Sequence, residues 1–418
     1  MLVRAYAASS LPILVKALVG IFLLRAFADY LGKDGLGRVS QFQGIALLIY
    51  AFLNACFYNH IAQNNWESRH SVIQFRRLLG IITLACFILG LLLALSAESI
   101  SRLSLGDDSA VNAIYLLAIT CPFTGVFIAY YGHVCASNRL VTFNVLNALA
   151  LLLSSLLIYY LVIRHGEQGA FVGFALYFIF PALLVAPMLL LNRENYSNFL
   201  PMFSGLKTYP YQLVLKVGFV GIFSALNAIG IQLFLRNELS ASEGWSAVGD
   251  WQALTKISES YLLLVTTPLS TYFLPQISKI KILDEQNELL NKALLMGVGI
   301  TVLCGVGIYV LWNLVILKII GLSFAPLRSL LPLQIFGDIF KVITWTFALA
   351  SIARMRLRVV LYSEIIFTLL YVILVMTLIP LQGLRGAIYA YGFSYVGSTL
   401  FFIVWNKKEL NEQYSSTS

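Results

Sequence analysis

Six ionisable side chains interrupt long apolar segments of the chain: Lys16, Lys256, Glu259, Asp338, Lys341 and Glu364. Lys256 and Glu259 lie three residues apart, as do Asp338 and Lys341, and this spacing puts each pair on one face of a helix. At mid-bilayer each charge costs roughly 2.5–3.5 kcal/mol on insertion scales, so six facing lipid would cost on the order of 15–20 kcal/mol. They must therefore pair with one another or line a wet cavity.

Two interpretations of these charges remain open. The two pairs are either local ion pairs that let polar helix faces insert, or they belong to a site. In the second interpretation Lys256, Lys341 and, third, Lys16 attract an anion, and the three carboxylates pair with them or couple transport to an ion. Three cations on three helices exceed what insertion requires, which favours a binding site.

The composition places these residues in a membrane protein. Of 418 residues, 59% are apolar and 11% charged, whereas a soluble protein carries about 25% charged residues. Five cysteines without a Cys-x-x-Cys pair and four dispersed histidines predict neither a disulfide scaffold nor a metal site. We find no nucleophile–base constellation and no phosphate-binding glycine loop. The sequence therefore predicts neither an enzyme nor an ATP-driven pump, and no bound cofactor.

Apolar segments long enough to cross a bilayer recur along the whole chain. A spanning helix needs about 20 apolar residues. Twelve segments meet this requirement: 11–31, 39–60, 78–98, 111–135, 141–163, 169–191, 211–235, 249–274, 292–317, 329–352, 358–379 and 384–405. The connections are short. We therefore expect an all-α polytopic membrane protein with two six-helix lobes, residues 1–200 and 201–418, around a central cavity.

The distribution of lysine and arginine predicts the orientation. With twelve spans, the side that carries the N-terminus has sixteen basic loop residues and the other side has eight. Basic residues accumulate on the cytoplasmic side of membrane proteins, so both termini are expected in the cytoplasm. The excess accounts for most of the net charge of +9, and binding to nucleic acid is not needed to explain it.

A weak repeat at half length supports the two lobes. Residues 36–41, before the second segment, match residues 248–252, before the eighth, at an offset of 212. The ends of these two segments match at an offset of 216, and Pro122 and Pro332 lie 210 residues apart. A duplicated six-helix unit that returns the chain to the same side predicts a parallel repeat, which is a transporter architecture.

Three stretches of the sequence resemble the Wzx flippases of lipid-linked oligosaccharides. Residues 249–275, which contain Gly-Asp-Trp-Gln and later Ile-Ser-Glu-Ser-Tyr, are similar to the family's helix 8, particularly in the enterobacterial common antigen (lipid III) type. Residues 333–341, Leu-Gln-Ile-Phe-Gly-Asp-Ile-Phe-Lys, are similar to the family's helix 10. Gly35-Leu36-Gly37 fits the turn between its helices 1 and 2. The resemblance spans essentially the whole chain.

The resemblance implies a fold, a substrate and a place in the cell. Wzx proteins belong to the MOP exporter superfamily, which also contains the MATE transporters, and have twelve helices in two lobes. They move O-antigen or common antigen repeat units, linked to undecaprenyl pyrophosphate, from the cytoplasmic to the periplasmic leaflet of the bacterial inner membrane by alternating access. The partners implied are this glycan, membrane lipids, and the polymerase and chain-length regulator of the polysaccharide pathway. The membrane potential, or an H⁺ or Na⁺ gradient, would drive export.

The sequence leaves three alternatives to the flippase. A MATE-like exporter of drugs or other small molecules would share the fold, and only substrate tests separate it from a flippase. A major-facilitator transporter usually carries a Gly-Asp-Arg-type motif between helices 2 and 3, where this chain reads Asn65-Trp66-Glu67-Ser68-Arg69-His70. A membrane-bound glycan polymerase normally has a large periplasmic loop, and none of the loops predicted here is long enough.

Overall fold

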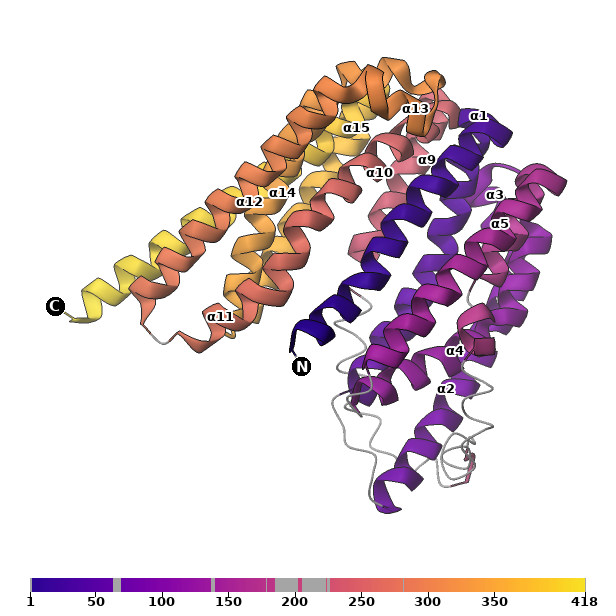
Figure 1. Cartoon of the computed structure of the whole chain (residues 1–418), viewed down its shortest axis with the longest axis horizontal. Helices are drawn as coiled ribbons and strands as arrows, with labels where there is room; N and C mark the ends of the chain where they lie inside the picture. Colours follow the sequence, from indigo (N-terminus) through magenta and orange to yellow (C-terminus); the bar gives the residue numbers. More distant parts are fainter. Residues whose placement is uncertain are drawn as a thin grey trace. The chain divides into compact units, whose positions relative to one another are not determined.

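The regular structure of the described residues is entirely helical (Figure 1). The computed structural model describes residues 2–62, 69–136, 140–177, 179–184, 202–204, 223, 226–280 and 282–417. They form two compact units, residues 1–237 and 238–418. The expected all-α class is confirmed. The expected lobe boundary at residue 200 stays a prediction, because residues 185–201 lie outside the described part of the chain.

The described residues of the first unit form five helices, a π-helical turn and the start of a further helix. These are α1 (Leu2–Ala62), α2 (Arg69–Leu95), α3 (Ala97–Leu105), α4 (Val111–Ala136) and α5 (Leu140–Leu176), followed by a π-helical turn η3 (Leu226–Gly230) and α9 (Ile231–Glu243). Helix α1 packs along α5, and α2 packs along α4 (Figure 1). The rings of Phe42 and Phe171, 5.0 Å apart, join α1 to α5, and both side chains are fully buried.

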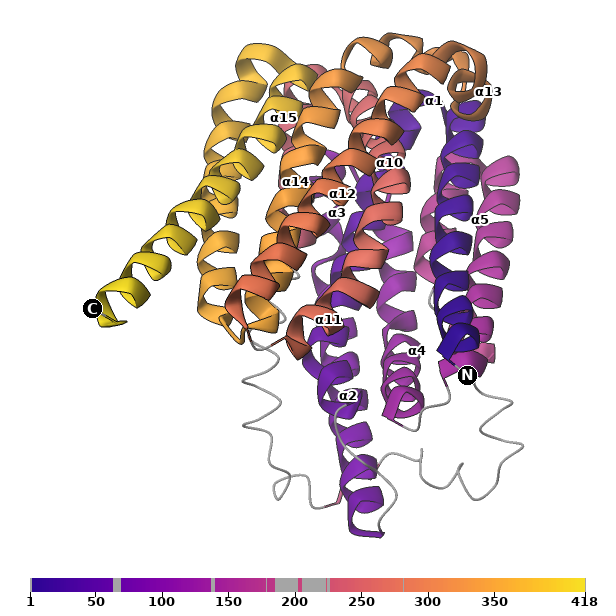
Figure 2. The same ribbon diagram turned by 60° about the vertical axis from the view of Figure 1, so that its left-hand side comes forward.

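The second unit contains the end of α9 and nine further helical elements. These are α10 (Trp245–Pro268), η4 (Leu269–Phe273), α11 (Leu274–Lys279), α12 (Leu283–Leu311), η5 (Trp312–Ile316), α13 (Leu317–Ile320), η6 (Leu322–Ser329), α14 (Leu331–Ala353) and α15 (Leu357–Thr417). Helix α14 packs against α10, α12 and α15 (Figure 2). Its Val342 and Leu349 share a buried cluster with Val265 of α10 and Leu290 of α12. Helix α14 is therefore covered by its neighbours, and polar groups on it must find partners inside the unit.

Pro268 disturbs the helix that the sequence analysis places at 249–274. Proline removes one backbone hydrogen bond and its ring crowds the preceding turn. In the structure α10 ends at Pro268 and the π-helical turn η4 begins with the next residue. The charged residues of α10 lie before this break, so they occupy a regular α-helix.

Three of the long helices are each interrupted at one glycine. In each of these helices the glycine lies between two predicted spans. The backbone leaves the helical region at Gly32 in α1, at Gly166 in α5 and at Gly383 in α15. Positive φ is strained for residues with a Cβ atom and is readily adopted by glycine. These breaks lie between the predicted spans 11–31 and 39–60, 141–163 and 169–191, and 358–379 and 384–405.

The glycines with positive φ repeat at half the length of the chain. They form three pairs, Gly32 with Gly244, Gly106 with Gly321, and Gly166 with Gly383, separated by 212, 215 and 217 residues. Gly166 (φ 58°, ψ −134°) and Gly383 (φ 52°, ψ −128°) have nearly the same backbone conformation. In each compact unit three glycines thus turn the chain at corresponding positions, which supports the duplicated unit expected from the sequence.

Six helices of the described residues are long and apolar enough to cross a membrane: 71–95, 111–134, 144–176, 284–314, 331–353 and 357–405. The last of them has 49 residues and is broken at Gly383, so it contains two of the predicted spans. Most of the predicted span 211–235 lies outside the described residues. The structure therefore confirms a multi-pass membrane protein, and the number of twelve spans stays a prediction.

Candidate functional site

The carboxylate of Asp338 lies fully buried in the second unit, at the meeting of three helices. Its Oδ2 atom accepts hydrogen bonds from the Ser258 hydroxyl, at 2.6 Å, and from the Tyr261 hydroxyl, both on α10. Its Oδ1 atom accepts hydrogen bonds from the Tyr391 hydroxyl of α15, at 2.6 Å, and from the side-chain amide of Gln334, at 3.3 Å. Hydrogen bonding of this kind offsets the cost of burying a charged group.

Helical periodicity aligns the residues that meet at Asp338. On α14, Gln334, Asp338 and Lys341 follow one another at spacings of four and three residues, which keeps them on one face. On α10, Ser258 and Tyr261 are three residues apart. On α15, Tyr391 and Tyr395 are four apart. Each helix therefore presents one polar stripe to its neighbours.

Gly337 allows α14 and α15 to approach closely beside the carboxylate. A Cβ atom at this position would lie 2.6 Å from Cδ1 of the Tyr391 ring and 3.2 Å from the Cα atom of Gly392. Because real Cβ contacts are longer than this, the ring of Tyr391 can pack on the backbone of α14 only where no side chain intervenes. The glycine thereby brings the Tyr391 hydroxyl within reach of Asp338.

Lys341 lies against aromatic rings. Its Nζ atom is 5.6 Å from the centre of the Tyr391 ring and 5.9 Å from that of the Tyr395 ring, distances at which a cation is attracted to a ring face. The expected ion pair with Asp338 is not formed: among the described residues no carboxylate oxygen lies within 4.0 Å of this ammonium group. Asp338 is instead satisfied by hydroxyl and amide donors.

Lys256 and Glu259 form the local ion pair that their spacing predicts. The Lys256 Nζ atom lies 2.8 Å from Oε2 of Glu259, and the two side chains are 30% and 42% exposed. An ion pair with this much exposure contributes little to stability. It leaves part of both groups accessible, which is compatible with either interpretation made from the sequence.

The other two candidates are Glu364 and Lys16. Glu364 is half-buried on α15, and its backbone carbonyl accepts the Thr368 hydroxyl. Lys16 is exposed on α1, in the first unit. Within the second unit the structure therefore brings Asp338 and Lys341 together through tyrosines, and pairs Lys256 with Glu259.

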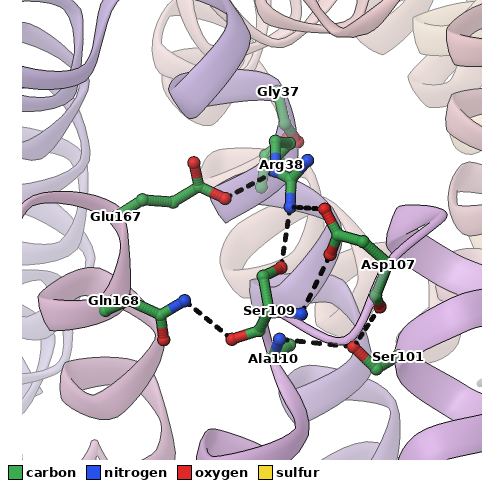
Figure 3. Close-up of polar contacts among 9 residues, drawn as sticks. Gly37, Arg38, Ser101, Asp107, Ser109, Ala110, Glu167 and Gln168 are labelled. Atoms are coloured by element: carbon green, nitrogen blue, oxygen red, sulfur yellow. Dashed lines mark hydrogen bonds and ion pairs between the residues drawn. The ribbon is translucent and has the colours of Figure 1, made fainter.

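A second polar cluster lies in the first unit and joins its three glycine turns (Figure 3). The Arg38 guanidinium binds Glu167 through Nε, at 2.5 Å, and both Asp107 (2.6 Å) and the Ser109 hydroxyl (2.7 Å) through Nη2. Gln168 donates to the backbone carbonyl of Ser109, at 2.8 Å. The Arg38 side chain is 18% exposed. One arginine thus connects the segments that follow Gly32, Gly106 and Gly166.

The hydrogen bonds of this second cluster lower the pKa of Asp107. Partial burial acts to raise that pKa, but hydrogen bonds from the Ser109 side chain, from Arg38 and from the Ser109 backbone outweigh it and hold it below its usual range. Asp107 is therefore a carboxylate near neutral pH. The cluster stabilises turns and leaves no excess of positive charge, so the site of Asp338 and Lys341 is the better candidate for binding.

Sequence comparison relates the chain to flippases. No protein-family model matches it. Two curated proteins named Lipid III flippase, from Escherichia coli (strain K12) and Shigella flexneri, are each 25% identical over 396 residues, which is 92% of this chain and 92% of the relative. The chain is similar to the lipid III flippases over nearly its whole length. This confirms the resemblance stated from the sequence. Neither name mentions O-antigen. Flippases are transporters rather than enzymes.

Comparison with solved structures shows the fold of the chain. A structure named lipid II flippase MurJ, inward closed conformation, superposes with a TM-score of 0.77 at 16% identity, covering 96% of this chain and 87% of that one. An inward-facing multidrug resistance MATE transporter of the MOP superfamily gives 0.66 at 17% identity, covering 99% and 100%. The chain therefore has the fold that these two transporters share, which is the fold expected from the sequence.

Sequence reasoning missed several residues of the site. Tyr391 contributes a hydroxyl and a ring face, Tyr395 a ring face and Tyr261 a hydroxyl, and none of the three was among the candidates selected from the sequence. The available signal was a pair of tyrosines four residues apart in the predicted span 384–405, on the same helix face. Arg38, which organises the cluster in the first unit, was one of the basic loop residues used to predict the orientation and was not selected as a candidate.

Proposed function

We propose that the chain moves an undecaprenyl-pyrophosphate-linked oligosaccharide from the cytoplasmic to the periplasmic leaflet of a bacterial inner membrane, with both termini in the cytoplasm. The observation that carries this proposal is the relationship to two lipid III flippases over 92% of both chains. The MOP fold supports it, because proteins named as a lipid II flippase and as multidrug transporters share that fold. A common antigen repeat unit is the preferred substrate.

The site in the second unit has chemistry that suits the pyrophosphate. Lys341 carries a positive charge that no carboxylate oxygen approaches within 4.0 Å among the described residues, and its aromatic neighbours leave that charge available to an anion. Lys256, half-buried beside Glu259, is a second cation in the same unit. We therefore assign Lys341 first, Lys256 second and Lys16 third as residues that bind the pyrophosphate or an acidic sugar.

The membrane potential is sufficient to favour export of this anion. Moving about two negative charges outward across an inside-negative potential of about 100 mV releases roughly 4–5 kcal/mol. Coupling to H⁺ or Na⁺ through Asp338, Glu259 or Glu364 is an additional hypothesis. Transport into vesicles that is indifferent to imposed pH and sodium gradients would exclude it. The family resemblance also supports association with the polymerase and the chain-length regulator of the pathway.

Complementation tests the proposed function directly. The chain is expressed in an E. coli K12 strain that lacks its lipid III flippase, and both the accumulated lipid-linked oligosaccharide and the surface common antigen are measured. We expect the intermediate to fall and the antigen to return. An intermediate that persists while the protein is correctly inserted would contradict this substrate. A panel of drug sensitivities would then test the MATE-like alternative.

In the same assay, Lys341→Ala should abolish restoration of the antigen, because the mutant loses the cation proposed to hold the pyrophosphate. Lys292→Ala is the matched control, since Lys292 belongs to an exposed pair with Glu288 on α12, with side chains 66% and 67% exposed. The control should restore the antigen like the unmodified chain. Full export by inserted Lys341→Ala would remove this residue from the site.

A further inference from the structure

Asp338 has no remaining capacity to accept hydrogen bonds. An ionised carboxylate offers about four lone-pair sites. Ser258 and Tyr261 occupy two on Oδ2, and Tyr391 and Gln334 occupy two on Oδ1. A carboxylate surrounded in this way holds its donors in fixed positions. In this structure Asp338 therefore acts on its neighbours by orienting them.

Tyr391 is the donor that connects this carboxylate to the candidate binding cation. Its hydroxyl donates to Asp338 at 2.6 Å, and the centre of its ring lies 5.6 Å from Nζ of Lys341. Tyr391 therefore contacts both groups, in addition to the direct electrostatic attraction between Asp338 and Lys341.

The ring of Tyr391 is confined on two further sides. Gly337 presents bare backbone to it, so that a methyl group added there would lie 2.6–2.7 Å from two ring carbons. The Tyr395 ring meets it edge-on, with centres 5.1 Å apart and planes at 77°. With the hydroxyl anchored and the ring packed on both sides, the surface offered to the ammonium group is held in place.

We propose that Tyr391 is a positioning residue for substrate binding, which uses its hydrogen bond to Asp338 to hold Lys341 where it meets the pyrophosphate of the lipid-linked glycan. This inference rests on the proposed function. It assigns to Asp338 the role of anchor and to Tyr391 the role of support, while Lys341 contacts the anion. Removal of the hydroxyl should therefore weaken substrate binding in the same way as removal of the carboxylate charge.

The test compares two conservative variants on α15, Tyr391→Phe and Tyr389→Phe. Both keep an aromatic ring, but the Tyr391 hydroxyl donates to Asp338, whereas the Tyr389 ring stacks on Phe393. The protein is reconstituted in phosphatidylethanolamine–phosphatidylglycerol vesicles. The initial rate of translocation of undecaprenyl pyrophosphate carrying one N-acetylglucosamine is measured against its mole fraction. The half-saturating fraction reports binding, and the maximal rate reports the later steps.

We expect Tyr391→Phe to raise the half-saturating fraction about tenfold, which corresponds to the loss of one hydrogen bond to a charged group. The maximal rate should stay within about twofold, and the control Tyr389→Phe should change neither quantity by more than about twofold. Asp338→Asn should raise the half-saturating fraction similarly. The double variant Asp338→Asn/Tyr391→Phe should be no worse than the poorer single variant, because both act through one contact.

Gly337→Ala provides a second test that keeps every polar group. Its methyl group must displace the Tyr391 ring, so we expect the half-saturating fraction to rise in the same direction. Equal effects of Tyr391→Phe and Tyr389→Phe, or additive effects of Asp338→Asn and Tyr391→Phe, would overturn the inference while wild-type translocation still supports the function. No translocation by the wild-type protein would instead contradict the proposed function itself.

Discussion

In the first unit a cluster of charged side chains lies at the turns, whereas in the second unit Asp338 and Lys341 lie in the middle of a helix. In residues 1–237, Arg38 joins Asp107 and Glu167, each of which follows one of the glycine turns. In residues 238–418, Asp338 and Lys341 lie inside α14 and meet tyrosines of α10 and α15. The glycine turns recur at half length, but the charges do not.

The corresponding turn of the second unit, at Gly383, is held by a different contact. The Glu243 carboxylate accepts the backbone N–H of Leu384, at 2.9 Å, directly after Gly383. A carboxylate at the beginning of a helix is stabilised by the free N–H groups and the helix dipole. The two units therefore share their backbone turns, whereas the polar groups at those turns differ.

The largest effect on stability is expected from alanine at Gly169 and at Gly386. These glycines lie three residues after the corresponding turns at Gly166 and Gly383. A Cβ atom on Gly169 would lie 2.0 Å from the carbonyl oxygen of Leu161, and one on Gly386 would lie 2.1 Å from that of Leu378. Because backbone atoms cannot move aside cheaply, either change to alanine should cost about 3 kcal/mol or abolish folding. The yield and thermal midpoint of purified protein would be measured.

Gly20→Ala and Gly299→Ala are the controls for these variants, since an added Cβ atom would meet nothing within 4 Å at either position. They should be neutral or slightly stabilising, because alanine favours a helix over glycine by about 1 kcal/mol. If one of Gly169→Ala and Gly386→Ala were tolerated and the other not, the two turns would not be structural equivalents.

A smaller effect is expected from Arg38→Met, which leaves Asp107 and Glu167 without their common partner. Loss of a largely buried partner costs about 1–3 kcal/mol. Arg102→Met is the matched control, because the Arg102 pair with Asp108 is 62% and 54% exposed and such pairs contribute about 0–1 kcal/mol. Thermal unfolding of both variants measures the difference. Equal midpoints would show that the cluster does not stabilise the first unit.

The same cluster should make the thermal stability depend on pH in the acidic range. The pKa of Asp107 is lowered in the folded protein, so its contribution is complete above the unfolded value of about 3.9 and is lost as the pH falls through the folded value. We expect the thermal midpoint to drop as the pH falls below about 4. Arg38→Met should show a smaller drop than the unmodified protein. An unchanged drop would mean that other carboxylates cause it.

The smallest effect is expected from Glu243→Gln in the second unit. Glu243 is exposed, and replacement by an amide keeps an acceptor for the N–H of Leu384 while removing the charge. The loss should be about 0.3–1 kcal/mol and should shrink in high salt. A loss as large as that of Arg38→Met would show that both units depend on charge at their turns to the same degree.

Much of the architecture followed from local patterns in the sequence. The length and spacing of apolar segments predicted an all-α membrane protein, and nearly every described long helix coincides with one or two predicted segments. The i,i+3 spacing predicted the Lys256–Glu259 pair, which the structure confirms. The short motifs near residues 249–275 and 333–341 pointed to the flippases to which the whole chain proved similar.

Tertiary structure decided which polar groups meet. The spacing of Asp338 and Lys341 also allowed an ion pair, yet the carboxylate binds hydroxyls 80, 77 and 53 residues away and the lysine lies on rings. Arg38 meets Glu167 across 129 residues. Helical periodicity fixes which side chains share a face, because it is a local property of the backbone. The partner that each face meets depends on how closely helices pack, and at Asp338 that depends on the missing side chain of Gly337.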